Sequence, residues 1–341
     1  MSLLPPLKSL NDIATYIVAD GKGILAADES NPTCSKRFDS ISVESTEDSR
    51  RDYREILFTS KGMNGNIGGT ILFDETIRQR SIGGVLLTDI IYSQGSLPGI
   101  KVDKGLNPFN ESDSETLTQG LDDLDERCFE YRKLGAKFTK WRAVINIGAD
   151  APTQECIDAN MDALAQYAKI AQKNNMVPIV EPEILMDGEH SAEDCLNASS
   201  RSLKSLFNFL DNYNVDITGT LLKPNMITAG SNNPDQISED EVASLTLECL
   251  KQHVPDGLPG IAFLSGGQSD IKATHHLDAM NKMGGGPWKL TFSYGRALQQ
   301  SALKTWLGKA ENKEAAQAAF SHRALMNRLA ASGKWSPDLE N

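Results

Sequence analysis

The chain has 341 residues, of which 40% are hydrophobic, and carries a formal net charge of -12 at neutral pH. This composition excludes a disordered or fibrous protein, and the acidic balance disfavours a nucleic-acid binder, which normally presents a basic patch. The length is enough for one large α/β domain or for two small ones.

The sequence predicts a cytoplasmic protein without membrane or nucleic-acid partners. Its five cysteines are widely spread and include no Cys-x-x-Cys pair, which favours free thiols in a reducing compartment. The first eight residues lack a basic-then-apolar signal pattern. No apolar run approaches the roughly 18 residues that span a bilayer.

Short apolar segments recur along the whole chain and predict strands. The spacing between them is roughly 30 to 45 residues, which fits a repeat of strand, loop, helix and loop. The eight predicted strands are residues 23–27, 70–73, 98–102, 138–144, 177–180, 220–222, 260–264 and 290–293.

The segments between the strands are predicted to be helical. Clear helical patterns cover residues 45–58, 159–172, 239–250 and 313–330. The first of them opens with Ser45-Thr-Glu-Asp48, a capping-box pattern. Glycine runs at Gly83-Gly84 and Gly284-Gly285-Gly286 are expected to be loops that precede strands.

Eight strand–helix units without an intervening linker predict a single (β/α)8 barrel with N-terminal and C-terminal helical extensions. We expect one domain over residues 1–341, with the core barrel at about 20–300 and a C-terminal helix and short tail at about 301–341. A doubly wound open sheet is the alternative, but the even spacing favours closure. Active sites of such barrels lie at the carboxyl ends of the strands. The residues that fall there are Asp28, Lys101, Asp103, Lys140, Arg142, Glu181, Lys223 and Ser265.

A lysine ends the sixth predicted strand, where Lys223 follows Gly219-Thr-Leu-Leu. Its side chain either runs along the barrel edge to water or does chemistry. A nucleophilic lysine needs an uncharged amine, which burial or a neighbouring cation favours, and Lys140 and Arg142 are predicted at the same barrel mouth. A lysine with carboxylates nearby is the arrangement for Schiff-base chemistry on a carbonyl.

Three carboxylates are predicted at strand ends. Asp28 closes the first strand and is either an acid–base group or a cap for the following helix. Glu181 and Glu183 share one face of their strand because side chains alternate along it. They are either salt-bridge partners of the cations or proton carriers, so at most one of them need be catalytic.

Two glycine-containing loops predict a phosphate site. Ser265-Gly-Gly-Gln-Ser269 follows the seventh strand, and Ser293-Tyr-Gly-Arg296 follows the eighth. Glycines let backbone N–H groups approach an anion, Arg296 adds a bidentate donor, and barrels usually bind phosphate in these two loops. A second basic cluster, Lys36-Arg37 with Lys101, is either another phosphate site or a solvated helix face.

Two motifs are set aside, and no metal or cofactor is expected. Gly21-Lys-Gly23-Ile-Leu-Ala26 matches the dinucleotide-binding pattern but leads into a strand instead of following one. His275 and His276 are neighbours, and neighbouring residues on a helix point in different directions. The other three histidines stand alone in the sequence.

At these residues the chain resembles the class I, Schiff-base-forming fructose-1,6-bisphosphate aldolases. The resemblance covers about residues 13–334 and rests on many long matches in order. The matching motifs are Gly21-Lys-Gly-Ile-Leu-Ala-Ala-Asp-Glu-Ser30, Gly99-Ile-Lys-Val-Asp-Lys-Gly105, Lys140-Trp-Arg142, Val180-Glu-Pro-Glu-Ile-Leu185, Leu221-Leu-Lys-Pro-Asn-Met226, Phe263-Leu-Ser-Gly-Gly-Gln-Ser269 and Leu290-Thr-Phe-Ser-Tyr-Gly-Arg-Ala-Leu298.

The resemblance implies reversible cleavage of fructose 1,6-bisphosphate to dihydroxyacetone phosphate and glyceraldehyde 3-phosphate, in glycolysis and gluconeogenesis, by a homotetramer. Lys223 matches the lysine that forms the iminium, Glu181 the acid/base of carbinolamine formation, and Asp28 the group that takes the C4 hydroxyl proton. The catalytic candidates are Lys223, Glu181, Asp28, Lys140 and Glu183. The expected substrate- and phosphate-binding residues are Ser30, Thr33, Lys101, Arg142, Ser265, Gly266, Gly267, Ser293, Gly295 and Arg296.

The chain departs from the family pattern in two places. Ser30-Asn-Pro-Thr33 stands where similar proteins often have Ser-Thr-Gly-Ser, and Thr33 keeps a hydroxyl group there. Many members end in a longer tail with a terminal tyrosine, whereas the last tyrosine here is Tyr294, so we expect enamine protonation to use another acid or to be slower. Two alternatives stay open: a Schiff-base lyase for another sugar phosphate such as sedoheptulose 1,7-bisphosphate, and a scaffold protein with incidental catalysis.

Overall fold

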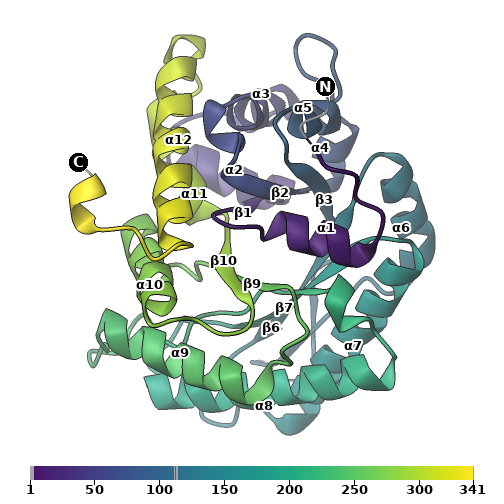
Figure 1. Ribbon diagram of the computed structural model, residues 1–341, viewed down its shortest axis with the longest axis vertical. Helices are drawn as coiled ribbons and strands as arrows, with labels where there is room; N and C mark the ends of the chain where they lie inside the picture. The colour runs from purple at the N-terminus through teal and green to yellow at the C-terminus, as the bar shows by residue number, and fades with distance from the viewer. Residues whose placement is uncertain (1–3, 111, 113, 341) are drawn as a thin grey trace.

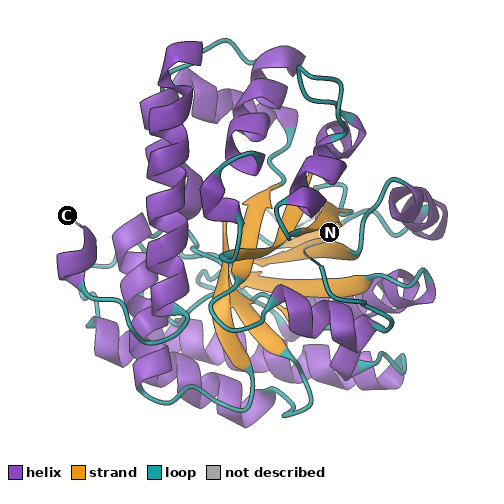
Figure 2. Ribbon diagram, turned by 45° about the horizontal axis from the view of Figure 1, so that its top comes forward, coloured by secondary structure: helices purple, strands orange, loops and turns teal. Residues whose placement is uncertain are grey.

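The computed structural model describes residues 4–110, 112 and 114–340. The prediction for the first eight residues and the predicted tail up to residue 341 therefore lie partly outside the described residues. Eight parallel strands close into a barrel in the order β1-β10-β9-β8-β7-β6-β3-β2. Helices surround it, as Figures 1 and 2 show, which confirms the predicted (β/α)8 barrel. The barrel strands are β1 (Gly23–Ala27), β2 (Ile67–Leu72), β3 (Leu97–Lys101), β6 (Phe138–Ile145), β7 (Val177–Ile184), β8 (Leu221–Leu222), β9 (Gly260–Phe263) and β10 (Lys289–Tyr294).

Twelve α-helices in the described residues accompany the barrel, and a small antiparallel hairpin, β4 (Leu106–Pro108) with β5 (Thr116–Thr118), follows β3. The helices are α1 (Leu10–Ile17), α2 (Asn31–Asp39), α3 (Glu47–Phe58), α4 (Asp74–Arg78), α5 (Leu87–Ser93), α6 (Leu124–Lys133), α7 (Gln154–Lys173), α8 (Ala192–Asn212), α9 (Glu239–His253), α10 (Asp270–Lys282), α11 (Arg296–Trp306) and α12 (Lys313–Ala330). Helix α12 has the predicted bounds.

Apolar side chains fill the barrel at its N-terminal end. The ring of Phe138 on β6 lies against two glycines, and a Cβ atom at Gly99 would come within 2.3 Å of it. Glycine is needed at this position because the Phe138 ring occupies the space that any side chain there would fill. Helix α1 buries Ile13 and Ile17 in the same cluster as Phe138 and lies across this end of the barrel in Figure 1. The opposite end of the barrel, at the carboxyl ends of the strands, therefore remains open to a ligand.

Two local predictions were wrong. Helix α3 begins one residue later than predicted, with Thr46 and not Ser45 as its N-cap, and the Thr46 side chain accepts a hydrogen bond from the Ser49 N–H. Ser and Thr are both favoured at the N-cap position, so the sequence pattern alone did not distinguish them. The Gly83-Gly84 turn precedes helix α5 and not a strand, because β3 begins only at Leu97.

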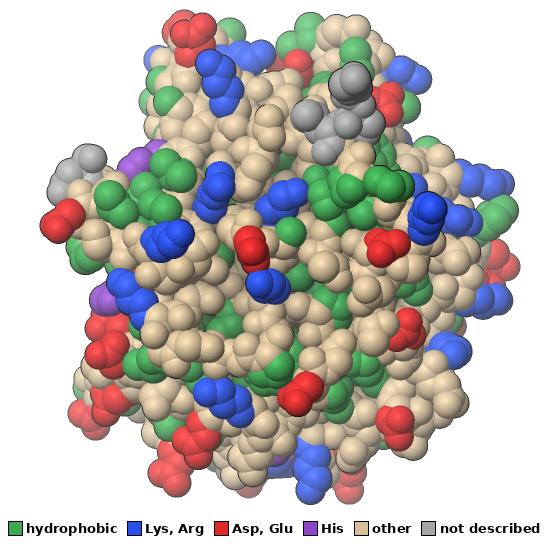
Figure 3. Space-filling model, in the orientation of Figure 1, with side chains coloured by type: hydrophobic (Ala, Val, Ile, Leu, Met, Phe, Trp, Pro, Cys, Tyr) green, Lys and Arg blue, Asp and Glu red, His purple; other side chains and the backbone are tan. Residues whose placement is uncertain are grey.

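On the face across which α1 lies, acidic and basic side chains are interspersed (Figure 3). All five cysteines are buried free thiols, as expected. No helix in the described part of the chain has the length and apolar character needed to span a bilayer.

Candidate active site

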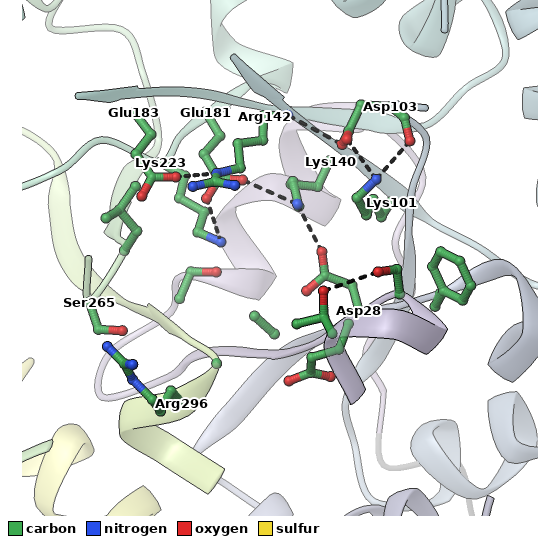
Figure 4. Close-up of a pocket in the computed structure, with 18 of the residues that line it drawn as sticks. Asp28, Lys101, Asp103, Lys140, Arg142, Glu181, Glu183, Lys223, Ser265 and Arg296 are labelled. Carbon is green, nitrogen blue, oxygen red and sulfur yellow. Dashed lines mark hydrogen bonds and ion pairs between the residues drawn. The ribbon is translucent and has the colours of Figure 1, made fainter. Parts of the chain in front are cut away.

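A cavity of about 1220 Å³ opens at the carboxyl ends of the barrel strands (Figure 4). The fifteen residues predicted to be catalytic or substrate-binding all line it, so closure of the barrel brings together positions that span most of the chain. They are Asp28, Ser30, Thr33, Lys101, Lys140, Arg142, Glu181, Glu183, Lys223, Ser265, Gly266, Gly267, Ser293, Gly295 and Arg296.

Four charged groups, of which Lys140, Glu181 and Lys223 are buried and Asp28 is partly buried, form a continuous chain at the base of this cavity. The Lys223 Nζ atom lies 2.9 Å from Glu181 Oε1. The Lys140 Nζ atom lies 2.8 Å from Asp28 Oδ2 and 3.3 Å from Glu181 Oε2, the latter an ion pair without hydrogen-bond geometry. A proton on Lys223 therefore has a carboxylate within direct reach, and that carboxylate shares Lys140 with Asp28.

The register of the barrel explains why these groups meet. Strands β6 and β7 pair in parallel so that Arg142 lies opposite Glu181, and the Lys223 N–H bonds to the Val180 carbonyl at 2.9 Å. Strand β7 continues to Ile184, four residues beyond the predicted end at residue 180, so Glu181 and Glu183 lie within the strand. They point into the cavity from within β7, and Pro182 between them did not end the strand.

The paired charges shift each other's proton affinity. Burial would raise the pKa of Asp28, but the charges of Lys140 and Lys223 outweigh it and lower that pKa to about 2. Burial likewise opposes ionisation of Glu181, yet the same two lysines lower its pKa below the usual range. For Lys140, the carboxylates of Asp28 and Glu181 outweigh burial and raise the pKa. At neutral pH the site holds two carboxylates around a permanent ammonium group.

This arrangement predicts a loss of stability in acid that is linked to Asp28. The pKa of Asp28 falls from the usual 3.8 to about 2 on folding. Between these two pH values the unfolded chain therefore binds more protons than the folded protein does. The contribution, about 2 kcal/mol, is complete above pH 4 and is lost as the pH falls toward 2. We expect urea unfolding to show a shallower pH dependence in that window for Asp28→Asn than for the unaltered protein. Identical slopes would contradict the assignment.

A second pair of charges lies beside the first. Arg142 donates a hydrogen bond through Nε to the Glu183 carboxylate. Of the two interpretations of the glutamates, salt-bridge partner or proton carrier, the structure shows the first for Glu183. Lys101 Nζ lies 2.6 Å from Asp103 Oδ1 and also donates to the Asp103 carbonyl at 2.7 Å. Both cations are thus held at the cavity wall.

Residues 265–268, here called the glycine loop, follow β9. The Gln268 N–H closes this turn on the Ser265 carbonyl at 3.0 Å. Gly266 and Gly267 have φ angles of +54° and +89°, values that L side chains rarely adopt. Arg296 begins α11 beside this loop, and Figure 4 shows it at the same side of the cavity as Ser265. No described carboxylate lies within ion-pair distance of Arg296, which leaves it available to an anion.

The other side of the cavity carries the second group of binding candidates. The Ser30 and Thr33 hydroxyl groups lie 3.1 Å apart at the start of α2. Of the basic pair that follows, Arg37 lines the cavity and pairs with Glu29, whereas Lys36 is exposed outside it. The phosphate interpretation of this pair therefore applies to Arg37 alone.

Sequence reasoning missed other lining residues, among them Met186 and Ser231. They follow β7 and β8, and the Ser231 N–H bonds to the Met186 carbonyl at 2.6 Å. The rule that barrel sites use the loops after each strand could have found them, although their residue types carry no chemical signal. Among the described residues, no group of three or more His, Cys, Asp and Glu side chains is placed to hold a metal ion.

Comparison with known proteins gives a consistent result. Residues 9–341 match the family described as fructose-bisphosphate aldolase class-I. Fructose-bisphosphate aldolase B of Gallus gallus is 50% identical over 330 residues, which cover 96% of this chain and 91% of the relative. Fructose-bisphosphate aldolase 5, cytosolic, of Arabidopsis thaliana is 49% identical over 324 residues, or 95% and 90% of the two chains.

A solved structure is similar over almost its whole length. It is a ternary co-crystal structure of fructose-bisphosphate aldolase from Plasmodium falciparum with TRAP and a small-molecule inhibitor. The two chains have a TM-score of 0.94 and 47% sequence identity, with 96% of this chain and 95% of the other covered.

Proposed function

Because this chain belongs to the class I fructose-bisphosphate aldolase family and is a carbon–carbon lyase of glycolysis, we propose that it cleaves fructose 1,6-bisphosphate through a Schiff base on Lys223. The observation that carries this proposal is the buried contact of 2.9 Å between Lys223 Nζ and Glu181 Oε1, with Lys140 beyond it. A lysine amine and a carboxylate in direct contact are what addition to a carbonyl and loss of water require.

The first half of the reaction joins enzyme and substrate. Lys223 transfers a proton to Glu181 and attacks the C2 ketone, so that a C2–N bond forms as the carbonyl π bond breaks. The attacking nitrogen gives a second proton to the ketone oxygen, which becomes a hydroxyl group. Glu181 then returns a proton to that hydroxyl group, which leaves as water, and the iminium remains. Lys140 stays cationic throughout and stabilises the Glu181 carboxylate before the first transfer and after the second.

The second half breaks the C3–C4 bond. Asp28, ionised and held by Lys140 at 2.8 Å, accepts the C4 hydroxyl proton. The electron pair of the C3–C4 bond moves toward the iminium nitrogen, which yields glyceraldehyde 3-phosphate and an enamine on Lys223. Protonation of the enamine carbon and hydrolysis of the imine then release dihydroxyacetone phosphate and restore the amine.

Two anion sites at opposite sides of the cavity fit the two phosphates of this substrate. The glycine loop and Arg296 supply backbone N–H groups and a guanidinium group at one side. Ser30, Thr33, Lys101, Arg142 and Arg37 supply hydroxyl groups and positive charge at the other. A net charge of -12 elsewhere makes this local positive charge a focused site for an anionic sugar.

Borohydride trapping tests the proposal. With dihydroxyacetone phosphate and excess chelator, we expect reduction to leave a stable adduct on the intact protein, seen by mass spectrometry. Cleavage of fructose 1,6-bisphosphate and of sedoheptulose 1,7-bisphosphate, measured in parallel, then decides between the proposed substrate and the alternative. A protein that forms no adduct would contradict the Schiff-base mechanism.

Replacing Arg296 with alanine tests the phosphate site at the glycine loop. Loss of a charge-assisted hydrogen bond should raise KM for fructose 1,6-bisphosphate by about 10- to 100-fold, with a smaller effect on kcat. Steady-state kinetics measure both constants. Arg132→Ala, at an exposed position on α6 outside the cavity, is the matched control and should leave KM unchanged. A fall in kcat with an unaltered KM would rule out this role.

We also propose a homotetramer in the cytoplasm. The resemblance to the family supports the assembly, and the name of the Arabidopsis relative, which includes the word cytosolic, supports the location. Light scattering coupled to gel filtration measures the mass in solution. A mass of one or two chains would contradict the tetramer.

A further inference from the structure

The two neighbouring histidines on α10 have different surroundings, as expected for adjacent helical positions. His275 packs on Trp335, with 5.3 Å between ring centroids. His276 is completely buried on the other side of the helix, beneath the glycine loop. Among the described residues, the buried His276 ring has one hydrogen bond, and its partner belongs to a loop of the proposed site, so its role needs an explanation.

His276 contacts the loop through one side chain. Its Nδ1 atom lies 2.6 Å from Oε1 of Gln268, the last residue of the glycine loop. Gln268 is itself 8% exposed, and its Nε2 atom points at the Met226 sulfur at 3.7 Å. Met226 lies three residues after Lys223. The Gln268 amide thus joins the glycine loop to α10 on one side and to the segment after β8 on the other.

The roles of the atoms follow from these contacts. Since Gln268 Nε2 is a donor, Oε1 is the acceptor, and the hydrogen bond needs a proton on His276 Nδ1. The His276 Nε2 atom has no partner among the described residues, so a second proton would have none either. Burial accordingly lowers the pKa of His276 to about 4, and the ring stays neutral at pH 7 with its single proton on Nδ1.

We propose that His276 is a positioning residue that fixes the glycine loop, through Gln268, in the conformation that binds a substrate phosphate. Two successive glycines give this loop many alternative conformations. Gln268 is the one loop residue whose side chain makes hydrogen bonds to other described residues. A loop held in its binding conformation loses less entropy when the anion arrives. The inference rests on the proposed function, because it assumes that this loop receives a phosphate.

The expected effect is on binding and not on chemistry, because His276 touches none of the reacting groups. His276→Leu removes the donor and leaves Gln268 Oε1 buried without a partner. We expect KM for fructose 1,6-bisphosphate and the competitive inhibition constant of inorganic phosphate each to rise about tenfold, with kcat within about twofold. His276→Asn should restore both constants, since its amide nitrogen occupies the place of Nδ1. His275→Asn on the same helix is the matched control and should change neither.

A double-mutant cycle separates positioning from general loss of stability. Gln268→Met removes the other half of the hydrogen bond, so the double variant with His276→Leu should be no worse than either single variant. If His276→Leu does not fold, Gln268→Met alone should still show the tenfold rise in both constants. Additive effects, an equal loss in His276→Leu and His276→Asn, or a fall in kcat with unchanged KM would each overturn the inference.

A parent protein that neither cleaves the bisphosphate nor forms the adduct would overturn the proposed function too, whereas an active parent with unaffected variants overturns this inference alone.

Discussion

Lys223→Ala is expected to abolish cleavage of fructose 1,6-bisphosphate, with kcat reduced by at least ~10⁴-fold, and to remove the borohydride-trapped adduct completely. The physical reason is that no covalent electron sink forms without the amine, so the electrons of the C3–C4 bond have no acceptor. The loss of the adduct, measured by intact mass, reports the chemistry independently of the rate. An adduct that persists at full yield in the variant would assign the Schiff base to another lysine.

Two companion variants make this result interpretable. Lys223→Arg keeps a cation beside Glu181 and so preserves the ion pair, but guanidinium is not a nucleophile at neutral pH, and we expect neither adduct nor cleavage. Lys289→Ala, whose side chain pairs with Asp20 on the surface, should retain both. If Lys223→Arg restored activity, the lysine would act through its charge and the covalent mechanism would be wrong.

The second large effect is expected for Asp28→Asn, which should lower the rate of bond cleavage by about 10²- to 10⁴-fold while the adduct with dihydroxyacetone phosphate still forms. An asparagine can hold Lys140 by a hydrogen bond but cannot accept the C4 hydroxyl proton. Trapping needs only Lys223 and Glu181, whose contact is 2.9 Å and does not involve Asp28. Single-turnover cleavage and trapping yield, measured on the same preparation, separate the two steps.

A carboxylate in the same cavity provides the control. Asp187 lines the cavity at an exposed position, and no described cation lies within ion-pair distance of it. Asp187→Asn should therefore leave both cleavage and trapping close to those of the unaltered protein. A parallel loss of trapping and cleavage in Asp28→Asn would mean that Asp28 acts earlier, in formation of the iminium, and would contradict the assigned role.

Much of the architecture could be predicted because it follows from local chemistry. Alternation of apolar segments with helical patterns sets the order of strands and helices, and helix α12 has its predicted bounds at Lys313–Ala330. Predictions failed where neighbouring residues are chemically equivalent or where pairing overrides propensity. Thr46 caps α3 in place of Ser45, and β7 extends through Pro182 to Ile184 because β6 pairs along its whole length.

By itself the sequence determined which residue types stand near the carboxyl ends of the strands: a lysine, carboxylates and two glycine-containing loops. These residue types indicated the class of chemistry. Only the tertiary structure decided which charges meet. Lys140 lies between Asp28 and Glu181, Arg142 pairs with Glu183, and His276 bonds to Gln268. The reason is physical, since periodicity along a chain sets the face on which a side chain lies. The partner that a side chain meets depends instead on barrel closure and strand register, which many non-local contacts fix together.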